Sequence, residues 1–502
     1  MQKNQSKIKS SINGFIWMFF GSVFNTLIQF LIIGVLARLL EPRDFGAIGI
    51  ILIFVNYSNI ITKMGLSSAL VQLSSISKSH IGISYSLSIL FGLIIGVVFY
   101  FGSTKIALYF DQESLIKPMQ FFSIFFPIYS FNSISTALLQ RKLKFSVLVK
   151  ISSIAYFFGY GLTSITLAFM GYGLWSLVYG QLAILLVTTL LLLYFQKPIF
   201  SLNFKKKTVK ELIYFGSGLT IDLNFNFLAE NADNIIVAKL LGASSLGIYS
   251  RAFQFLALPA TFFGKIYDQV LFPVLSSIKE ETKMLTSFYI FSISFCLTFL
   301  LPVSLFLLIN AELIVLIVLG EKWLEVILPF QILIVGLCLR FGTRINKSFL
   351  KSLGLVYHGA KYQFFFALFM IVNCLVGAHY FGLPGVAAAV FITTLFNYFQ
   401  VAFRIQKKID AKYSYFISLH LRSLLTTIPF VIIIIGMATL HLGNSLILLL
   451  ISTIALIAVL LWVTRFKKSL LFESHNRKVL KLVLNNLPTK LAPITRALKL
   501  DQ

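Results

Sequence analysis

The stretch Pro118-Met119-Gln120 recurs 211 positions later as Pro329-Phe330-Gln331, and this repetition decides the fold. The tight connection Gly171-Tyr172-Gly173 recurs at the same offset as Gly382-Leu383-Pro384-Gly385. Both pairs lie at matching places in two similar hydropathy patterns. Each short motif alone would be a weak signal, but a shared offset indicates that the chain contains two copies of one unit.

A second spacing supports the duplication. Ala37-Arg38-Leu39-Leu40 and Ala238-Lys239-Leu240-Leu241 are 201 positions apart, and they are followed by Phe45-Gly46 and Leu246-Gly247. Many membrane transporters are built from two such repeats with a site between them. The sequence therefore predicts two lobes around a central cavity.

The composition is that of a membrane protein. About 58% of the residues are hydrophobic and 12% are charged, a balance that excludes a soluble domain of this length. Apolar runs such as Phe15–Leu36 and Phe288–Ile309 are long enough to cross about 30 Å of hydrocarbon as helices. We expect an all-α polytopic membrane protein with about 14 transmembrane helices. The expected spans are 14–37, 44–68, 81–102, 115–138, 147–170, 174–195, 211–236, 244–274, 286–309, 325–350, 361–380, 384–405, 417–440 and 445–464.

The net charge of +26 is distributed in a way that argues against nucleic-acid binding. Lys and Arg concentrate in alternate loops, as in Lys205-Lys206-Lys207, whereas the intervening loops carry few of them. This alternation follows the positive-inside rule and predicts that both termini lie in the cytoplasm. An even number of spans agrees with that orientation.

The repeat also predicts the domain organisation. Because each copy has six expected spans, both copies enter the membrane from the same side and should be parallel repeats. The expected parts are an N-terminal six-helix lobe at 1–200, a C-terminal six-helix lobe at 201–410, two additional transmembrane helices at 411–465 and a basic cytoplasmic tail at 466–502. The tail alternates apolar and basic residues, which is typical of a segment that lies on an anionic membrane surface.

Polar side chains inside spans are costly, so they usually face a protein interior or an aqueous cavity. Most of them occur in the first, second, seventh and eighth expected spans, where they recur at helical spacing and so share one face. We predict that these faces line the central cavity. The cationic candidates for substrate binding are Lys63, Arg251, Lys265 and Arg344, the polar candidates are Asn25, Gln29, Asn56, Asn59, Asn226 and Gln254, and the ion-coupling candidates are Asp222, Glu230 and Asp233.

Two interpretations of these charges stay open. Arg and Lys suit phosphate oxygens, so the cations could hold an anionic headgroup, while the acids pair with them or bind a coupling proton or sodium ion. Alternatively, pairs such as Glu230 and Arg251 are fixed salt bridges that join helices. Arg344, in the tenth expected span, is as consistent with flanking charge of the positive-inside kind as with a ligand role.

Several functional classes leave no signature in the sequence. It contains no Walker A motif, dinucleotide fingerprint or HExxH motif, and no expected loop is long enough to carry the catalytic residues of a polymerase or ligase. The histidines are scattered, and Cys296, Cys338 and Cys374 lie in apolar runs, where we expect them to pack in the core. We therefore predict a secondary transporter that is not an enzyme and uses neither metal nor cofactor.

The order of several motifs resembles one family. Ala37-Arg38-Leu39-Leu40-x-Pro42-x-Asp44-Phe45-Gly46 is similar to the opening of bacterial polysaccharide-repeat-unit flippases, the Wzx-type members of the multidrug/oligosaccharidyl-lipid/polysaccharide exporter superfamily. Leu139-Gln140-Arg141-Lys142-Leu143-x-Phe145 and Gly171-x-Gly173-x-Trp175-x-Leu177-Val178 look like its colanic-acid-exporter branch. So does Ala232-Asp233-Asn234-x-x-Val237-x-x-Leu240-Leu241-Gly242. The resemblance covers roughly residues 10–460.

The resemblance implies a 14-helix fold of two six-helix lobes with two added helices. It implies a flippase in the bacterial cytoplasmic (inner) membrane that moves undecaprenyl-pyrophosphate-linked oligosaccharide repeat units to the outer face by alternating access, for O-antigen, capsule or exopolysaccharide synthesis. The basic cavity residues would meet the pyrophosphate, and polar residues such as Asn56, Asn59 and Gln254 would meet sugars. The implied partners are the lipid-linked substrate, membrane lipids, polymerase or chain-length machinery, and H⁺ or Na⁺ as coupling ion.

Two other functions stay open at this point. A drug/cation antiporter of the same fold would differ in its cargo, and transport of cationic dyes by the purified protein in liposomes would favour it. A membrane polysaccharide polymerase or ligase belongs to a different class, and sugar transfer by the purified protein would favour that one.

Overall fold

The chain folds into helices. The computed structural model describes residues 21, 24–63, 65–73, 75–200, 209, 211–212, 224, 227–228, 230–266, 275, 281–353, 356–409, 412–425, 427–428, 431–432 and 445–466. All regular secondary structure in these residues is helical. The contacts divide the chain into two compact units. Unit 1 contains the described residues up to Ser250 together with Val318–Lys322, and unit 2 contains those of Arg251–Ile317 and from Trp323 onward.

Many of these helices are long and apolar enough to cross a membrane. Within the described residues, six helices meet that criterion, or up to eight if each of two bent helix pairs is counted as one span. The protein is therefore an all-α, multi-pass membrane protein, as the composition predicted. The six helices are Pro42–Lys63, Lys78–Tyr109, Phe145–Phe169, Leu174–Phe195, Thr282–Ile309 and Tyr362–Lys408.

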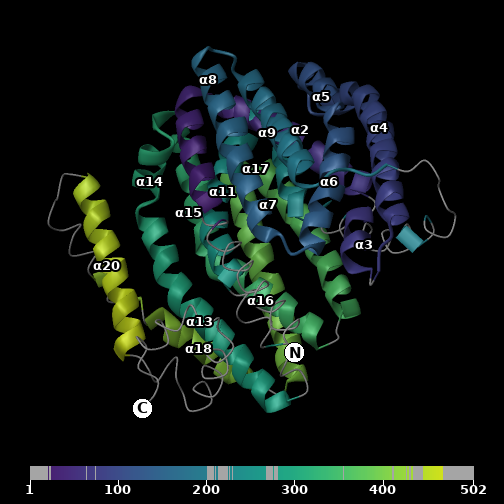
Figure 1. The fold of residues 1–502 in the computed structure, drawn as a ribbon. Coiled ribbons are helices and arrows are strands. Elements are labelled where there is room, and N and C mark those ends of the chain that lie inside the picture. Colours follow the sequence, from purple (N-terminus) through teal and green to yellow (C-terminus); the bar gives the residue numbers. More distant parts are fainter. Residues whose placement is uncertain are drawn as a thin grey trace. The chain divides into compact units, whose positions relative to one another are not determined.

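Unit 1 is a bundle in which α4 packs on α6, and α6 packs on α3 and α9 (Figure 1). The segment η2 is a π-helix within the α7–α8 span. The helix α11 (Gly242–Ile266) begins in unit 1 and continues into unit 2. The described helices of unit 1 include an apolar helix at Phe24–Leu39, α2 (Pro42–Lys63), α3 (Leu66–Gln72), α4 (Lys78–Tyr109), η1 (Glu113–Leu115), α5 (Ile116–Phe122), α6 (Phe125–Arg141), α7 (Phe145–Ile154), η2 (Ala155–Leu162), α8 (Thr163–Phe169) and α9 (Leu174–Phe195).

The expected spans 44–68 and 115–138 of unit 1 each contain a break that the sequence analysis did not predict. Gly65 separates α2 from α3 with a left-handed backbone (φ 64°). Glycine adopts this conformation without the strain that a Cβ would cause. The second span bends by 44° between Phe122 and Phe125. The first break creates the short helix α3, which contributes to the site described below.

The start of α9 agrees with the expected span 174–195. Gly173 precedes it with a positive φ of 49°. The carboxylate of Asp44 in α2 lies against this turn and accepts a hydrogen bond from the backbone N–H of Leu174. The first N–H groups of a helix have no partner within it, so a carboxylate at this place satisfies one of them.

Unit 2 contains a second bent helix pair. The helices α15 and α16 meet at Gly336 with a bend of 46°, inside the expected span 325–350. The described helices of unit 2 include α13 (Thr282–Ile309), α14 (Ala311–Val318), η4 (Glu321–Val326), α15 (Ile327–Val335), α16 (Leu337–Ser352), α17 (Val356–Lys408), α18 (Tyr413–Leu425) and α20 (Ser445–Phe466). Residues Val318–Lys322, from the end of α14 to the start of η4, belong to unit 1.

The helix α17 reverses direction at Gly382, whose backbone is not helical (φ 61°, ψ −142°). A Cβ on Gly377 would lie 2.4 Å from the carbonyl oxygen of Gly385, so the two arms touch beside the turn. Further along, Asn373 Nδ2 lies 3.3 Å from Thr393 Oγ1. The two arms are therefore antiparallel neighbours, in agreement with the predicted turn.

The core of unit 2 contains a chain of buried polar side chains. The hydroxyl of Tyr289 donates to Asn346 Oδ1 (2.9 Å), and Asn346 Nδ2 donates to the carbonyl oxygen of Tyr398 (3.1 Å). The hydroxyl of Tyr398 lies 2.9 Å from His420 Nε2. Buried polar groups that are satisfied in this way fix the packing of their helices.

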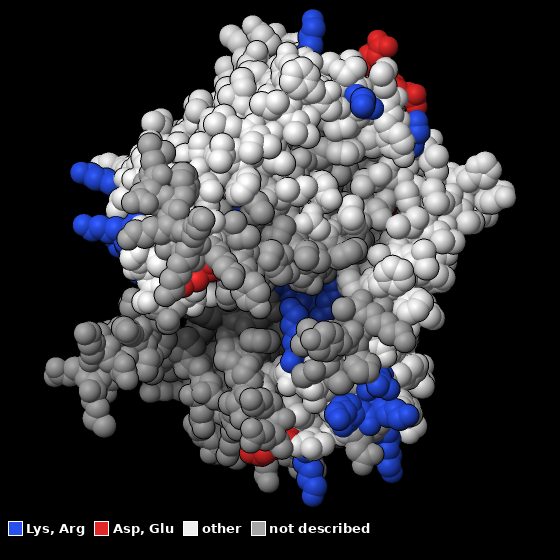
Figure 2. All heavy atoms as spheres, turned by 90° about the vertical axis from the view of Figure 1, so that its right-hand side faces the viewer, with Lys and Arg blue, Asp and Glu red and all other residues white. Residues whose placement is uncertain are grey.

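The three cysteines behave as predicted. Cys296, Cys338 and Cys374 are all buried and free of disulfides. On the outer surface, large apolar side chains such as Phe101 and Tyr194 are exposed, which suits a lipid-facing surface. In the view of Figure 2, most of the surface that is not grey carries no charged side chain, and Lys and Arg side chains gather at the lower right.

Candidate functional site

A cavity of about 400 Å³ lies in unit 1 where the end of α2 meets α3 and α6. It exists because Gly65 interrupts the second span, so α3 leaves the direction of α2 and packs on α6. Nine of its eleven lining residues have polar side chains. The lining residues are Lys63, Ser67, Ser68, Val71, Gln72, Tyr129, Asn132, Ser133, Thr136, Ala137 and Gln140.

One face of α6 forms the longer wall of the cavity. Tyr129, Asn132, Ser133, Thr136 and Gln140 recur three or four positions apart, so they share one side of the helix. The opposite wall is α3, which supplies two serines and a glutamine. A polar face of this kind inside a membrane helix bundle is costly unless it meets water or a polar ligand.

Arg141 holds α3 in place. Its Nη1 donates to the carbonyl oxygens of Leu70 (2.8 Å), Val71 (3.3 Å) and Leu73 (2.5 Å). These carbonyl groups lie at the C-terminal end of α3. The last carbonyl oxygens of a helix accept no hydrogen bond from the helix itself, and this end carries a partial negative charge. The guanidinium group therefore fixes the end of α3 against the end of α6.

Asn132 is the most buried polar residue of the α6 wall. It is 6% exposed, and its Nδ2 donates to Thr189 Oγ1 (3.0 Å), whose own hydroxyl donates to the carbonyl oxygen of Leu185. Its Oδ1 finds no hydrogen-bond partner among the described residues. A buried carbonyl oxygen without a partner is costly, so this acceptor is available to a ligand or to water.

The cavity carries a single positive charge in its described lining. Within the described lining, Lys63 is the one charged side chain, and no carboxylate is present. The amides and hydroxyls can each donate and accept hydrogen bonds. The cavity is therefore suited to a ligand that is rich in hydroxyl or amide groups.

The structure brings one predicted cation into the cavity and places the neighbouring predicted amides elsewhere on α2. Lys63 lines the cavity, Asn56 is exposed, and Asn59 is buried with an Oδ1 that has no partner among the described residues. Asn25 donates through Nδ2 to Ser152 Oγ (2.9 Å), which ties its helix to α7.

The predicted acid Asp233 is embedded in hydrogen bonds. It is 4% exposed, and Tyr249 donates its hydroxyl to Oδ2 (2.7 Å). The backbone N–H and the side-chain amide of Asn234 donate to Oδ1 (2.8 and 3.1 Å). By contrast, Glu230 is exposed and Gln29 is half-buried.

Three predicted cations belong to unit 2, namely Arg251, Lys265 and Arg344. Arg251 Nη1 donates to Gln254 Oε1 (2.8 Å), so these two predicted residues of α11 contact each other. The guanidinium group of Arg344 packs against the same helix, because a Cβ on Gly264 would lie 2.4 Å from its Nη1. Asp222, Asn226 and the side chain of Lys265 lie outside the described residues.

Two ion pairs join loop and helix ends within unit 1. Lys239 Nζ lies 2.8 Å from Asp111 Oδ2 and 5.0 Å from the ring centre of Tyr109. Lys322 Nζ lies 2.6 Å from Glu41 Oε1. Nearby, the Arg38 side chain lies against Gly320. We call this set the loop cluster: Arg38, Glu41, Tyr109, Asp111, Lys239, Gly320 and Lys322.

Beside the loop cluster, the starts of α2 and α11 cross in backbone contact. A Cβ on Gly46 would lie 1.6 Å from the carbonyl oxygen of Ala243, and a Cβ on Gly247 would lie 1.9 Å from that of Pro42. The contact is reciprocal, because 42 and 243, and also 46 and 247, are each 201 positions apart. Small residues let membrane helices approach this closely.

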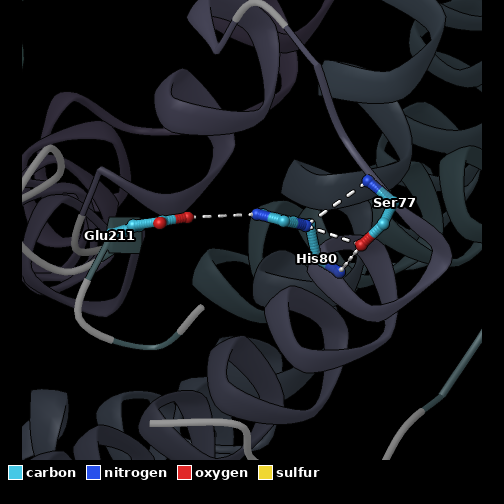
Figure 3. Close-up of polar contacts among 3 residues, drawn as sticks. All are labelled: Ser77, His80 and Glu211. Atoms are coloured by element: carbon cyan, nitrogen blue, oxygen red, sulfur yellow. Dashed lines mark hydrogen bonds and ion pairs between the residues drawn. The ribbon is translucent and has the colours of Figure 1, made fainter. Parts of the chain in front are cut away.

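A third polar cluster lies at the start of α4 (Figure 3). His80 Nδ1 lies 2.7 Å from Ser77 Oγ, and its Nε2 lies 3.5 Å from Glu211 Oε2. Ser77 is the N-cap of α4 and accepts from the backbone N–H of His80. The neighbouring Leu212 packs into the core beside α3, so this cluster attaches residues 211–212 to unit 1.

Comparison with known proteins identifies the family. Residues 35–328, more than half of the chain, match the family described as polysaccharide biosynthesis protein. The chain belongs to this family. The matched region of this polysaccharide biosynthesis protein contains the whole cavity, both ion pairs of the loop cluster and the crossing of α2 with α11.

Several known proteins are similar in sequence to the chain. The lipopolysaccharide biosynthesis protein WzxC of Escherichia coli (strain K12) is 26% identical over 78% of this chain and 79% of its own length. The teichuronic acid biosynthesis protein TuaB of Bacillus subtilis (strain 168) is 24% identical over 69% of this chain and 72% of its own length. An uncharacterised membrane protein in the cps region of Klebsiella pneumoniae is 27% identical over 64% and 67%, respectively.

Solved structures show the same fold at low sequence identity. The lipid II flippase MurJ in an inward closed conformation superposes with a TM-score of 0.74 at 16% identity, over 91% of this chain and 100% of that one. An inward-facing multidrug MATE transporter gives a TM-score of 0.62, also at 16% identity, over 77% and 94%. This polysaccharide biosynthesis protein thus has the fold that flippases and multidrug transporters share.

The sequence analysis missed most of the cavity. It selected Lys63 but none of the residues on α3 or α6. A usable signal was present at the end of the fourth expected span and just beyond it, where Asn132, Thr136 and Gln140 recur every four positions on one helical face.

Proposed function

We propose that this protein is a flippase that moves lipid-linked oligosaccharide repeat units across the bacterial cytoplasmic membrane for surface polysaccharide synthesis. The observation that carries the proposal is a cavity lined mainly by uncharged polar side chains, with one lysine, inside a membrane helix bundle of the polysaccharide biosynthesis family. Hydroxyl-rich headgroups need such a path through the hydrocarbon. The named relatives and the fold shared with a lipid II flippase support the same function.

The proposed architecture has 14 spans, in two parallel six-helix lobes with two added helices. Three features support the duplication. The two bent helix pairs occur close to the 211-residue offset, and the glycine turns at Gly171 and Gly382 also keep that offset. The α2–α11 crossing is reciprocal at an offset of 201. The lobe boundaries at 1–200, 201–410 and 411–465, and the cytoplasmic tail at 466–502, remain proposals drawn from the sequence.

The proposed mechanism is alternating access. With cytoplasmic termini, as the positive-inside pattern predicts, the loop cluster and the helix crossing lie at the outer side of the membrane. There, the ion pairs and the backbone contact would hold the outer path closed while the cavity of unit 1 receives the headgroup from the cytoplasm. Opening would require the crossing to separate, and the lipid tail would stay in the bilayer.

We infer different roles for the remaining candidates. Arg251 and Arg344 carry guanidinium groups, which suit pyrophosphate oxygens, and Lys265 would add to them. Asp222 or the exposed Glu230 would carry a coupling H⁺ or Na⁺. The hydrogen bonds of Asp233 favour a structural role for this carboxylate, because its oxygens already accept three bonds.

Partners would include membrane lipids and the polymerase or chain-length machinery that receives the flipped repeat units. Transport, rather than glycan synthesis, would be the task of the chain itself. The two remaining alternatives, drug antiport and glycan polymerisation, predict different cargo or chemistry and can be tested beside it.

Transport by purified protein in liposomes tests the proposal. We expect a polyprenyl-pyrophosphate-linked glycan to move from one leaflet to the other. A lectin or glycosidase added outside the liposomes would detect the glycan that has reached the outer leaflet. Lys63→Ala, Arg251→Ala and Lys265→Ala should reduce this movement while the protein stays membrane-inserted and abundant. Transport of cationic dyes without glycan movement, or sugar transfer by the purified protein, would contradict the proposal.

A further inference from the structure

We propose that the cavity of unit 1 binds a sugar ring of the transported glycan, and that the pyrophosphate of the same substrate is bound elsewhere. This inference rests on the proposed function and concerns which part of the substrate the cavity contacts. The residues that would determine its specificity are Gln72, Asn132 and Gln140.

The charge of the cavity argues against pyrophosphate. A pyrophosphate that links a lipid to a sugar carries two negative charges, and proteins usually meet such groups with paired guanidinium forks or several cations. In the described lining, Lys63 is the sole cation. Arg141 is close in sequence to the wall, but its Nη1 is occupied by the carbonyl oxygens at the end of α3.

The hydrogen-bonding groups fit a sugar. Sugar hydroxyls both donate and accept, and so do the amides and hydroxyls that form the two walls. Asn132 offers an acceptor that has no partner among the described residues, and its Nδ2 is held by Thr189, which fixes the direction of the amide. The ring of Tyr129 adds a flat surface for the C–H face of a pyranose.

The size of the cavity limits the ligand to a small part of the substrate. Its volume of about 400 Å³ is near the lower end of the range for small-molecule pockets, about 300–1,000 Å³. A sugar ring fits such a space, whereas a complete lipid-linked oligosaccharide extends beyond it. The cavity would therefore bind one sugar ring of the glycan at a time.

Binding of simple glycosides tests this inference. Saturation-transfer NMR on the purified protein in lipid nanodiscs would use the methyl glycosides of glucose, galactose, N-acetylglucosamine and glucuronic acid. We expect at least one of them to bind, and inorganic pyrophosphate to leave that binding unchanged. Gln140→Ala and Asn132→Ala should each weaken binding about threefold to tenfold, the loss expected for one hydrogen bond.

The controls separate recognition from folding. Gln140 is exposed, so its replacement should leave the fold intact even if Asn132→Ala is destabilising. Asn373→Ala makes the same chemical change on α17 in unit 2, at a residue that is not part of the cavity lining, and should not alter binding. Absence of binding by all four glycosides, displacement by pyrophosphate, or equal effects of Asn132→Ala, Gln140→Ala and Asn373→Ala would overturn the inference.

The outcome is also separable from the proposed function. If the protein moves lipid-linked glycan in liposomes but fails these binding tests, the flippase proposal stands and the sugar assignment falls. If it moves no lipid-linked glycan, the proposed function fails first, whatever the glycosides do.

Discussion

The crossing of α2 and α11 provides the sharpest test of how the membrane helices pack. Replacement of Gly46 by alanine would place a Cβ 1.6 Å from the carbonyl oxygen of Ala243, whereas real Cβ contacts stay above 3.0 Å. The two backbones must therefore separate by roughly 1.4 Å (3.0 − 1.6) at this point. Backbone cannot rotate away as a flexible side chain can, so the whole crossing has to open.

The magnitude follows from packing. A radial gap of about 0.5–1 Å already forfeits a quarter to a half of the dispersion energy of the atoms that line it. Overpacking of a well-packed site typically costs about 1–3 kcal/mol. If the crossing is present in only one transport state, the same free energy lowers the population of that state by about 5- to 150-fold relative to the other.

The measurement compares Gly46→Ala with Gly102→Ala in purified protein. Gly102 is also helical, on α4, but a Cβ there meets nothing within 4 Å. We expect Gly46→Ala to lower the midpoint of thermal unfolding and to accelerate hydrogen exchange at residues 42–50. Gly102→Ala should leave the exchange unchanged and should not lower the midpoint, because alanine favours helix over glycine. Equal midpoints and equal exchange in the two variants would refute the backbone-contact argument.

Three further predictions concern polar contacts. Arg141→Gln removes the guanidinium group from the end of α3 and should reduce the free energy of unfolding by about 1.5–3 kcal/mol. Replacement of the exposed Lys144 by Gln is the control, and an equal loss of stability in the two variants would contradict this prediction. Tyr249→Phe leaves the buried Asp233 carboxylate with one hydrogen-bond donor fewer and should reduce the free energy of unfolding by a similar amount. Replacement of the exposed Tyr172 by Phe should leave the free energy of unfolding unchanged. Equal values for the two variants would mean that the 2.7 Å bond contributes nothing to stability. A double-mutant cycle with Glu41→Gln and Lys322→Gln should give a coupling below about 1 kcal/mol that declines with salt, because the two side chains are 60% and 49% exposed, respectively. A larger coupling, or one that salt does not change, would count against a solvent-screened pair.

Hydropathy predicted the described spans where a helix runs straight between turn residues. The expected span 174–195 is α9, and the turn expected after 380 occurs at Gly382. Hydropathy could not predict the bends, because Phe122 and Phe125 lie in an apolar stretch on both sides of the break. A bend of 44° depends on what the helix packs against, which a window average does not contain.

The candidate site was harder to predict for a related reason. Charge attracts attention inside an apolar sequence, and it directed the sequence analysis to Lys63 and to the acids of the seventh span. The cavity instead uses serine, threonine, asparagine and glutamine, which are common in membrane helices and often bond to their own backbone. What makes them a site is α3, and α3 exists because the chain turns at Gly65.

The reciprocal geometry at the helix crossing makes a last prediction that distinguishes the proposed duplication from coincidence. Gly247 occupies the place that Gly46 would have in a second copy, and its Cβ would lie 1.9 Å from the carbonyl oxygen of Pro42. Gly247→Ala should therefore lower the unfolding midpoint about as much as Gly46→Ala.

The double variant then separates one shared contact from two independent ones. Both substitutions strain the same pair of backbones, so once either has forced the helices apart, the second meets less resistance. The combined loss of stability should be clearly smaller than the sum of the single losses, because residues in contact do not act additively. Full additivity would mean that each glycine is accommodated by its own local shift, and the crossing could then not act as a single closure.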